Sequence, residues 1–270
     1  MATMSAALAR GPAPARSFAL SMALNLSVSA LGFDLLPKLV EFYGAPSLYY
    51  GLAGLAAPGL LLSPWLRTVR DERGARQTAA SLHSGPTAPM AVALFAALAL
   101  FTASGAVWSV VGRVGLEVGL TEARVGAALG GATLTGIIAG LLASWIGGRL
   151  SRPAMFLALS TLLLAAAMAG FTFLRGHVAF PLLTDAMMGG YVFAAPFYLG
   201  VVARLDPTGK LAAAFIAVQF AGLALGPALA APFLSSEIYS VFWMGAGLCA
   251  VALPLVLFAS ANQQAPVPRH

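Results

Sequence analysis

Apolar segments of about twenty residues recur along the chain, and they leave few folds open to it. A helix needs about 20 mainly apolar residues to cross the hydrocarbon core of a bilayer. Eight stretches reach that length: Phe18–Val40, Ser47–Leu66, Met90–Val111, Val125–Ile146, Ala154–Leu174, Val178–Val202, Leu211–Leu234 and Tyr239–Phe258. Lipid offers no water to backbone groups, so each stretch must satisfy them as a helix. The sequence predicts an all-α, polytopic integral membrane protein with about eight transmembrane helices.

Charge content supports this assignment. Charged residues make up 9% of the chain and hydrophobic residues 60%, with a mean hydropathy of +0.88. A soluble domain carries about 25% charged residues. The net charge of +6 could suggest nucleic acid, but the basic residues lie in short runs between apolar segments. We therefore expect the lipid bilayer, and no nucleic acid, as the partner of these surfaces.

The distribution of basic residues predicts the topology. With eight spans, 11 of the 15 lysines and arginines fall on one side of the membrane and four on the other. Positive residues concentrate on the cytoplasmic side, so both termini are predicted to lie in the cytoplasm, at a bacterial inner membrane. The basic, polar stretch 67–89 is then predicted to be a cytoplasmic linker, which ends with Pro86 and Pro89.

These boundaries divide the chain into five parts. Residues 1–17 form a cytoplasmic arm, 18–66 a helix pair, 67–89 the linker, 90–258 a six-helix transmembrane bundle, and 259–270 a cytoplasmic tail. Within the bundle, Met90–Leu174 and Val178–Phe258 are three-helix units that start on opposite sides of the membrane. This order is typical of an inverted-topology repeat.

One predicted helix of the bundle carries a face of small residues. Gly136, Gly140, Ser144 and Gly148 recur every fourth position, so they share one side of a helix. Small residues let a second helix backbone approach closely in a membrane. We expect this face to be a helix-packing surface. The turn that follows it is basic, with Arg149 and Arg152.

That turn carries a family resemblance. Residues 144–153 read SWIGGRLSRP, which is similar to the G-x-x-x-D-R-x-G-R loop of the major facilitator superfamily of secondary transporters. The segment DPTGK at 206–210, the glycines that follow it and the basic linker also resemble parts of that family. The resemblance implies that residues 90–258 correspond to the C-terminal six-helix half and residues 18–66 to the last two helices of the N-terminal half.

The motif departs from the family at several positions. Gly148 stands where the family has an acidic residue, and Ser144 and Ser151 stand at glycine positions. Only Arg149 and Arg152 carry over, and the resemblance implies a role for them at a cytoplasmic gate.

Asp185 is the leading candidate for a coupling or substrate-binding residue. It lies about two turns inside the predicted span Val178–Val202. A carboxylate within a membrane is costly, usually faces a cavity, and marks proton or substrate pathways. The alternative is a hydrated carboxylate near the interface or the cap of a broken helix.

The remaining candidates each have a structural alternative. Asp34 could form a local ion pair with Lys38, and Arg113, beside Trp108, could extend to lipid headgroups or hold an anionic group. Tyr191 and Tyr198 share a helical face that suits either a substrate or aromatic packing. For Gln219 an interhelical hydrogen bond is favoured over a substrate contact.

These features favour one function and leave an alternative. The first hypothesis is secondary active, proton-coupled transport of a small organic molecule by alternating access, with protons and substrate as ligands. The alternative is a scaffold or partner subunit that does not transport alone and associates with another helical bundle. No cofactor, metal motif or catalytic cluster is visible, so an enzyme is not expected.

Overall fold

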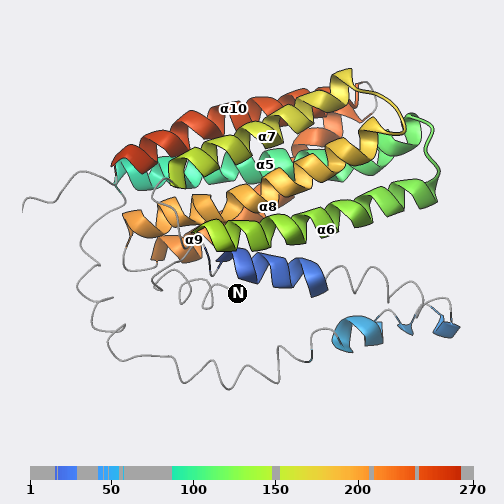
Figure 1. The fold of residues 1–270 in the computed structure, drawn as a ribbon, viewed down its shortest axis with the longest axis horizontal. Helices are drawn as coiled ribbons and strands as arrows, with labels where there is room; N and C mark the ends of the chain where they lie inside the picture. Colours follow the sequence, from blue (N-terminus) through green and yellow to red (C-terminus); the bar gives the residue numbers. More distant parts are fainter. Residues whose placement is uncertain are drawn as a thin grey trace, which may run out of the picture. The chain divides into compact units, whose positions relative to one another are not determined.

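Six long helices dominate the computed structural model (Figure 1). It describes residues 16, 18–28, 42–44, 46–47, 49–54, 57, 87–147, 153–206, 210–234 and 237–262. The helices are α5 (Ala88–Glu117), α6 (Glu122–Gly147), α7 (Pro153–Phe173), α8 (Ala179–Leu205), α9 (Lys210–Ala230) with the short 3-10 helix η3 (Ala231–Phe233), and α10 (Ser240–Ala261).

All six are long and apolar enough to cross a membrane, and they coincide with the last six predicted spans. The described residues contain no strand, which confirms the fold class as an all-α, polytopic membrane protein. The first predicted span begins with a shorter apolar helix, Phe18–Val28. The rest of that span, most of the second span and nearly all of the linker lie outside the described residues.

The helix contacts have the pattern of two inverted three-helix units. The main partner of α5 is α9, and the equivalent helices of the other unit, α8 and α6, make the matching pair. Likewise α5 lies against α10 as α8 lies against α7, and α7 packs on α10. The first helix of each unit is therefore central, and α5 and α8 are the most buried spans, at 67% and 72%.

The α5–α9 contact is closed by glycines. A Cβ added at Gly105 would lie 2.7 Å from the Leu223 carbonyl oxygen, and one at Gly222 would lie 2.7 Å from Phe101 Cβ. A Cβ added at Gly226 would overlap backbone atoms of Gly105 and Ala106. The two backbones can approach this closely only because no side chain stands between them.

The small-residue face of α6 is largely covered. Gly136, Gly140 and Ser144 are buried. Gly140 lies against Ala23 and Ala19 of the first helix and against Val192 of α8, with the nearest atom 3.2 Å from an added Cβ. Its fourth predicted member, Gly148, lies outside the described residues. This face therefore contacts two helices at once, rather than one.

Candidate functional site

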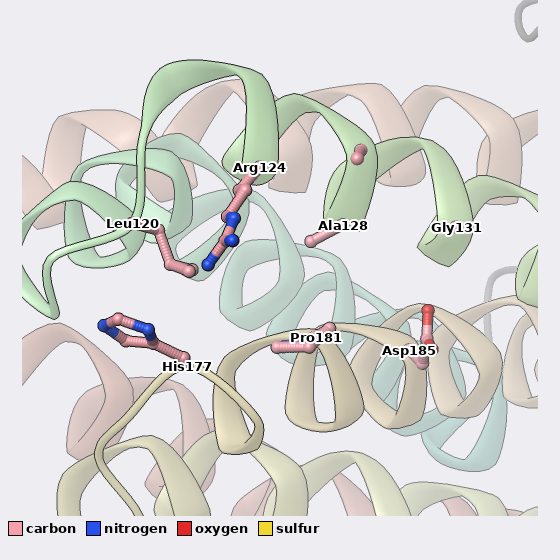
Figure 2. Close-up of a pocket in the computed structure, with 8 residues that line it drawn as sticks. Leu120, Arg124, Ala128, Gly131, His177, Pro181 and Asp185 are labelled. Carbon is pink, nitrogen blue, oxygen red and sulfur yellow. The ribbon is translucent and has the colours of Figure 1, made fainter.

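A cavity of about 370 Å³ lies where α6 and α8 begin (Figure 2). Both helices start at the same end of the bundle, after turns in which Gly119 and Gly176 adopt positive φ angles of 86° and 136°. Side chains other than glycine rarely adopt such angles. The two turns bring together the cavity lining: Leu120, Arg124, Ala127, Ala128, Gly131, His177, Pro181 and Asp185.

Asp185 lies at the inner end of this cavity. It is six residues beyond the start of α8, about 9 Å along the helix axis. Its Oδ1 faces Gly131 of α6, at 3.7 Å from where a Cβ would stand. Within the described part of the chain, this oxygen is fully buried and has no hydrogen-bond partner. An unsatisfied buried acceptor costs about 1–3 kcal/mol and more when charged, so the site calls for a proton or a donor.

Arg124 and His177 lie at the opposite end of the cavity. Figure 2 shows the Arg124 side chain descending from α6 and the His177 ring rising from the turn before α8. Neither side chain has an acidic partner within ion-pair distance among the described residues. These two residues were not among the candidates predicted from the sequence. Arg124 shares a helical face with Gly131, seven residues and two turns later, but this periodicity gives no sign of the carboxylate that faces Gly131 from α8.

Deeper in the bundle, two predicted residues meet. Gln219 of α9 donates a hydrogen bond from Nε2 to the Tyr191 hydroxyl of α8, at 3.3 Å. The Tyr191 ring packs edge-on against Phe101 of α5, with ring centroids 6.0 Å apart. Gln219 thus makes the interhelical hydrogen bond that the sequence favoured, and the pair links α8 to α9.

Tyr198 has a different partner. Its hydroxyl shares a 3.3 Å hydrogen bond with Thr161 Oγ1 of α7, and its side chain is almost fully buried. Tyr191 and Tyr198 share a helical face by sequence, yet one contacts α5 and α9 and the other α7. The reason is that α8 is covered by several helices, so the neighbour changes along its length.

Arg113 corrects one expectation. The predicted span Met90–Val111 ends before Arg113, but α5 continues to Glu117, and Arg113 Nε lies 3.4 Å from Glu117 Oε1. Both side chains are exposed, so the pair stabilises the helix by a few tenths of a kcal/mol at most. Trp108 is exposed on the same helix. Neither Trp108 nor Arg113 lines the cavity.

The other predicted site residues cannot be placed. Asp34, Arg149 and Arg152 lie outside the described residues, so the coupling role of the first and the gate role of the others stay predictions. No group of three or more potential metal ligands occurs among the residues that the structure describes.

Solved structures share this arrangement of helices. A crystal structure of the transporter FucP in its outward conformation aligns with a TM-score of 0.64 and 19% identity, over 83% of this chain and 58% of that chain. A structure of a variant of the E. coli fucose:proton symporter FucP aligns with a TM-score of 0.62 at the same identity and coverage. The chain has the fold of the major facilitator superfamily.

This confirms the resemblance seen in the sequence. No protein-family model matches the chain, and no curated protein sequence matches it. The chain spans 58% of the length of the FucP structures, and at 19% identity the likeness establishes the major facilitator fold and no more.

Proposed function

We propose that the chain takes part in proton-coupled transport of a small organic molecule, with Asp185 as the residue that takes up and releases the proton. One observation carries this proposal: Asp185 Oδ1 is buried without a hydrogen-bond partner among the described residues, and it borders a cavity that begins at the end of the bundle. A carboxyl oxygen in such a place can take up a proton or accept a hydrogen bond from a donor on the substrate. The proton symport of FucP is consistent with this chemistry.

The proposal includes the orientation of the chain in the membrane. The charge distribution supports an inner membrane with both termini in the cytoplasm. In that orientation the α6–α8 cavity opens to the outer side, and Arg149 and Arg152 belong to the cytoplasmic gate. The hydrogen bond between Gln219 and Tyr191 lies outside this cavity, between α8 and α9.

The test uses the purified chain in liposomes that contain a pH-sensitive dye. Sugars, amino acids, carboxylates and amines are added outside, and internal acidification is measured against protein-free liposomes. At least one class should acidify the interior, and Asp185→Asn should abolish that signal. Glu237→Gln is the matched control, because Glu237 is an exposed carboxylate at the same end of the bundle and does not line the cavity. Full proton movement in Asp185→Asn would refute the assignment.

A scaffold or partner subunit that associates with another helical bundle is the second candidate. Alternating access moves two bundles around a site between them. On this alternative, the purified chain moves no proton with any substrate, whereas co-expression with a second six-helix bundle yields a stable complex. Substrate-dependent acidification by the chain alone would exclude it.

A further inference from the structure

The two ends of the α6–α8 cavity have opposite character, and this suggests which ligand it accepts. Arg124 and His177 gather at the entrance, and Asp185 stands at the inner end (Figure 2). The wall between them consists of small or apolar residues: Leu120, Ala127, Ala128, Gly131 and Pro181. The lining thus offers one permanent cation and one carboxylate, with no polar side chain between the two ends.

The spacing of these ends limits the ligand. Arg124 precedes Gly131 by seven residues, about 10 Å along α6, and Asp185 Oδ1 lies opposite Gly131. Long helical side chains lean toward the helix N-terminus, which carries the guanidinium further from Asp185. A short zwitterion such as an α-amino acid therefore cannot place its carboxylate on Arg124 and its ammonium on Asp185 at once.

We propose that the cavity binds a small organic anion at Arg124 and His177, and that a proton on Asp185 accompanies it. The proposal rests on the proton role of Asp185 stated above and adds the substrate class. Arg124 has no acidic partner among the residues that the structure describes, so it suits a carboxylate, which an arginine can bind through two parallel hydrogen bonds. A cavity of about 370 Å³ is in the range of small-molecule sites.

The coupling is electrostatic. The proton comes from the aqueous phase, forms an O–H bond at Asp185 and returns to water on release, so no other reactant is needed. While Asp185 is ionised, it repels an anion at the entrance. Removing one charge at about 10 Å changes the affinity roughly tenfold at the effective dielectric of a protein. Proton and anion therefore favour each other's binding by the same factor.

Other charged groups do not interfere with this pair. Among the described residues, α7 carries no titratable side chain, and α9 faces α8 with Gln219. Glu122 of α6 is exposed outside the cavity, and the acidic group of α5, Glu117, is paired with Arg113. The titratable groups that line the cavity are Arg124, His177 and Asp185.

Binding to the purified full chain in detergent provides the test. The probes are monocarboxylates from acetate to benzoate, together with methanesulfonate and benzenesulfonate, which stay anionic. Isothermal titration in buffers of different ionisation enthalpy gives both Kd and the number of protons taken up. We expect a sulfonate to bind more tightly as the pH falls, with net uptake of at most about half a proton per bound sulfonate at a tenfold coupling, and at least tenfold weaker binding in Arg124→Gln. Asp185→Asn should bind the anion with no proton uptake.

The controls separate this result from a loss of folding. Arg175→Gln removes a neighbouring arginine that stacks on Tyr239 at 4.2 Å, and Glu237→Gln removes a carboxylate at the same end. Both should bind and take up protons like the parent, and each variant must elute as the parent does in gel filtration. The inference is wrong if no anion binds at about 10 mM, or if binding is insensitive to Arg124. Asp185-dependent proton movement with a sugar or an amine would refute the substrate class and leave the proposed function intact.

Discussion

The α5–α9 and α6–α8 contacts are equivalent pairs of the inverted repeat, and glycine brings the two backbones closer in the first than in the second. In the first pair, Gly105, Gly222 and Gly226 bring two backbones together with no space for a methyl group. In the second, among the described residues nothing lies within 4 Å of a Cβ at Gly126 or Gly130. Gly126 and Gly130 are exposed, whereas Gly140 of the same helix packs against Val192 of α8. The difference teaches that a glycine closes a helix pair only where it faces the partner helix.

The α6–α8 pair is also the polar one. Its open end holds Arg124, His177 and Asp185, whereas the α5–α9 contact is built from glycine, apolar residues and a phenylalanine. Both pairs include a central, largely buried helix, α5 in the first and α8 in the second, and the cavity lies only where α6 and α8 begin. The packed helices therefore position the groups that a ligand meets at that end.

The largest effect is expected from inserting a methyl group between α5 and α9. Gly226→Ala places a methyl group onto backbone atoms of Gly105 and Ala106, which cannot yield as a side chain does. Overpacking of this kind costs about 3 kcal/mol. The measurement is the denaturant midpoint of the purified protein in detergent. An unchanged midpoint would show that the two helices are not in backbone contact.

A second substitution tests the cavity while leaving the bundle packed. Gly131→Leu fills the space opposite Asp185 and should reduce substrate-driven proton movement at least about tenfold. Gly131→Ala is the matched control, because its Cβ would lie 3.7 Å from Asp185 Oδ1, an ordinary contact. Both variants should keep the Tm of the parent within a few degrees. Equal proton movement in the leucine variant would mean that the cavity is not the pathway.

The hydrogen bond between α8 and α9 should have a smaller effect. Interhelical hydrogen bonds in membrane proteins average about 0.6 kcal/mol. A double-mutant cycle with Tyr191→Phe and Gln219→Leu should therefore give a coupling energy near that value in unfolding experiments. Tyr198→Phe removes the separate hydrogen bond to Thr161, so its change in the free energy of unfolding should simply add to that of either other substitution. Full additivity of the first pair would indicate that their bond contributes nothing.

The smallest effect is expected at the open part of α6. Gly130→Ala meets no neighbour within 4 Å among the described residues, and it replaces a poor helix former with the best one. Stability should rise by about 0.5 kcal/mol, in contrast to the large loss at Gly226. The denaturant midpoints of the two alanine variants, measured side by side, make the comparison direct. A comparable loss at both positions would remove the distinction between the two helix pairs.

Much of the fold could be predicted because the bilayer sets the length of each apolar span. The six described helices match the predicted ones within a few residues, except where α5 continues past Val111 to Glu117. That extension is amphipathic and charged, so hydropathy alone ended the span too early. The inverted order of the two three-helix units followed from counting spans, and the helix contacts agree with it.

The site was only partly predictable. Asp185 could be found from sequence because a carboxylate inside an apolar span is rare on energetic grounds. Its companions could not be found in the same way, since Arg124 stands at the start of α6 and His177 in the turn before α8, where charged residues are common. They become notable only when the turns at Gly119 and Gly176 bring the starts of α6 and α8 together.

The sequence by itself determined the membrane class, the spans and the carboxylate, because these depend on the cost of polar groups in lipid. The tertiary structure decided which glycines close a contact and which leave a space. It also decided that Tyr191 meets Gln219 while Tyr198 meets Thr161. Helical periodicity assigns each residue to a face, but the identity of the helix that covers that face depends on packing distant parts of the chain against each other.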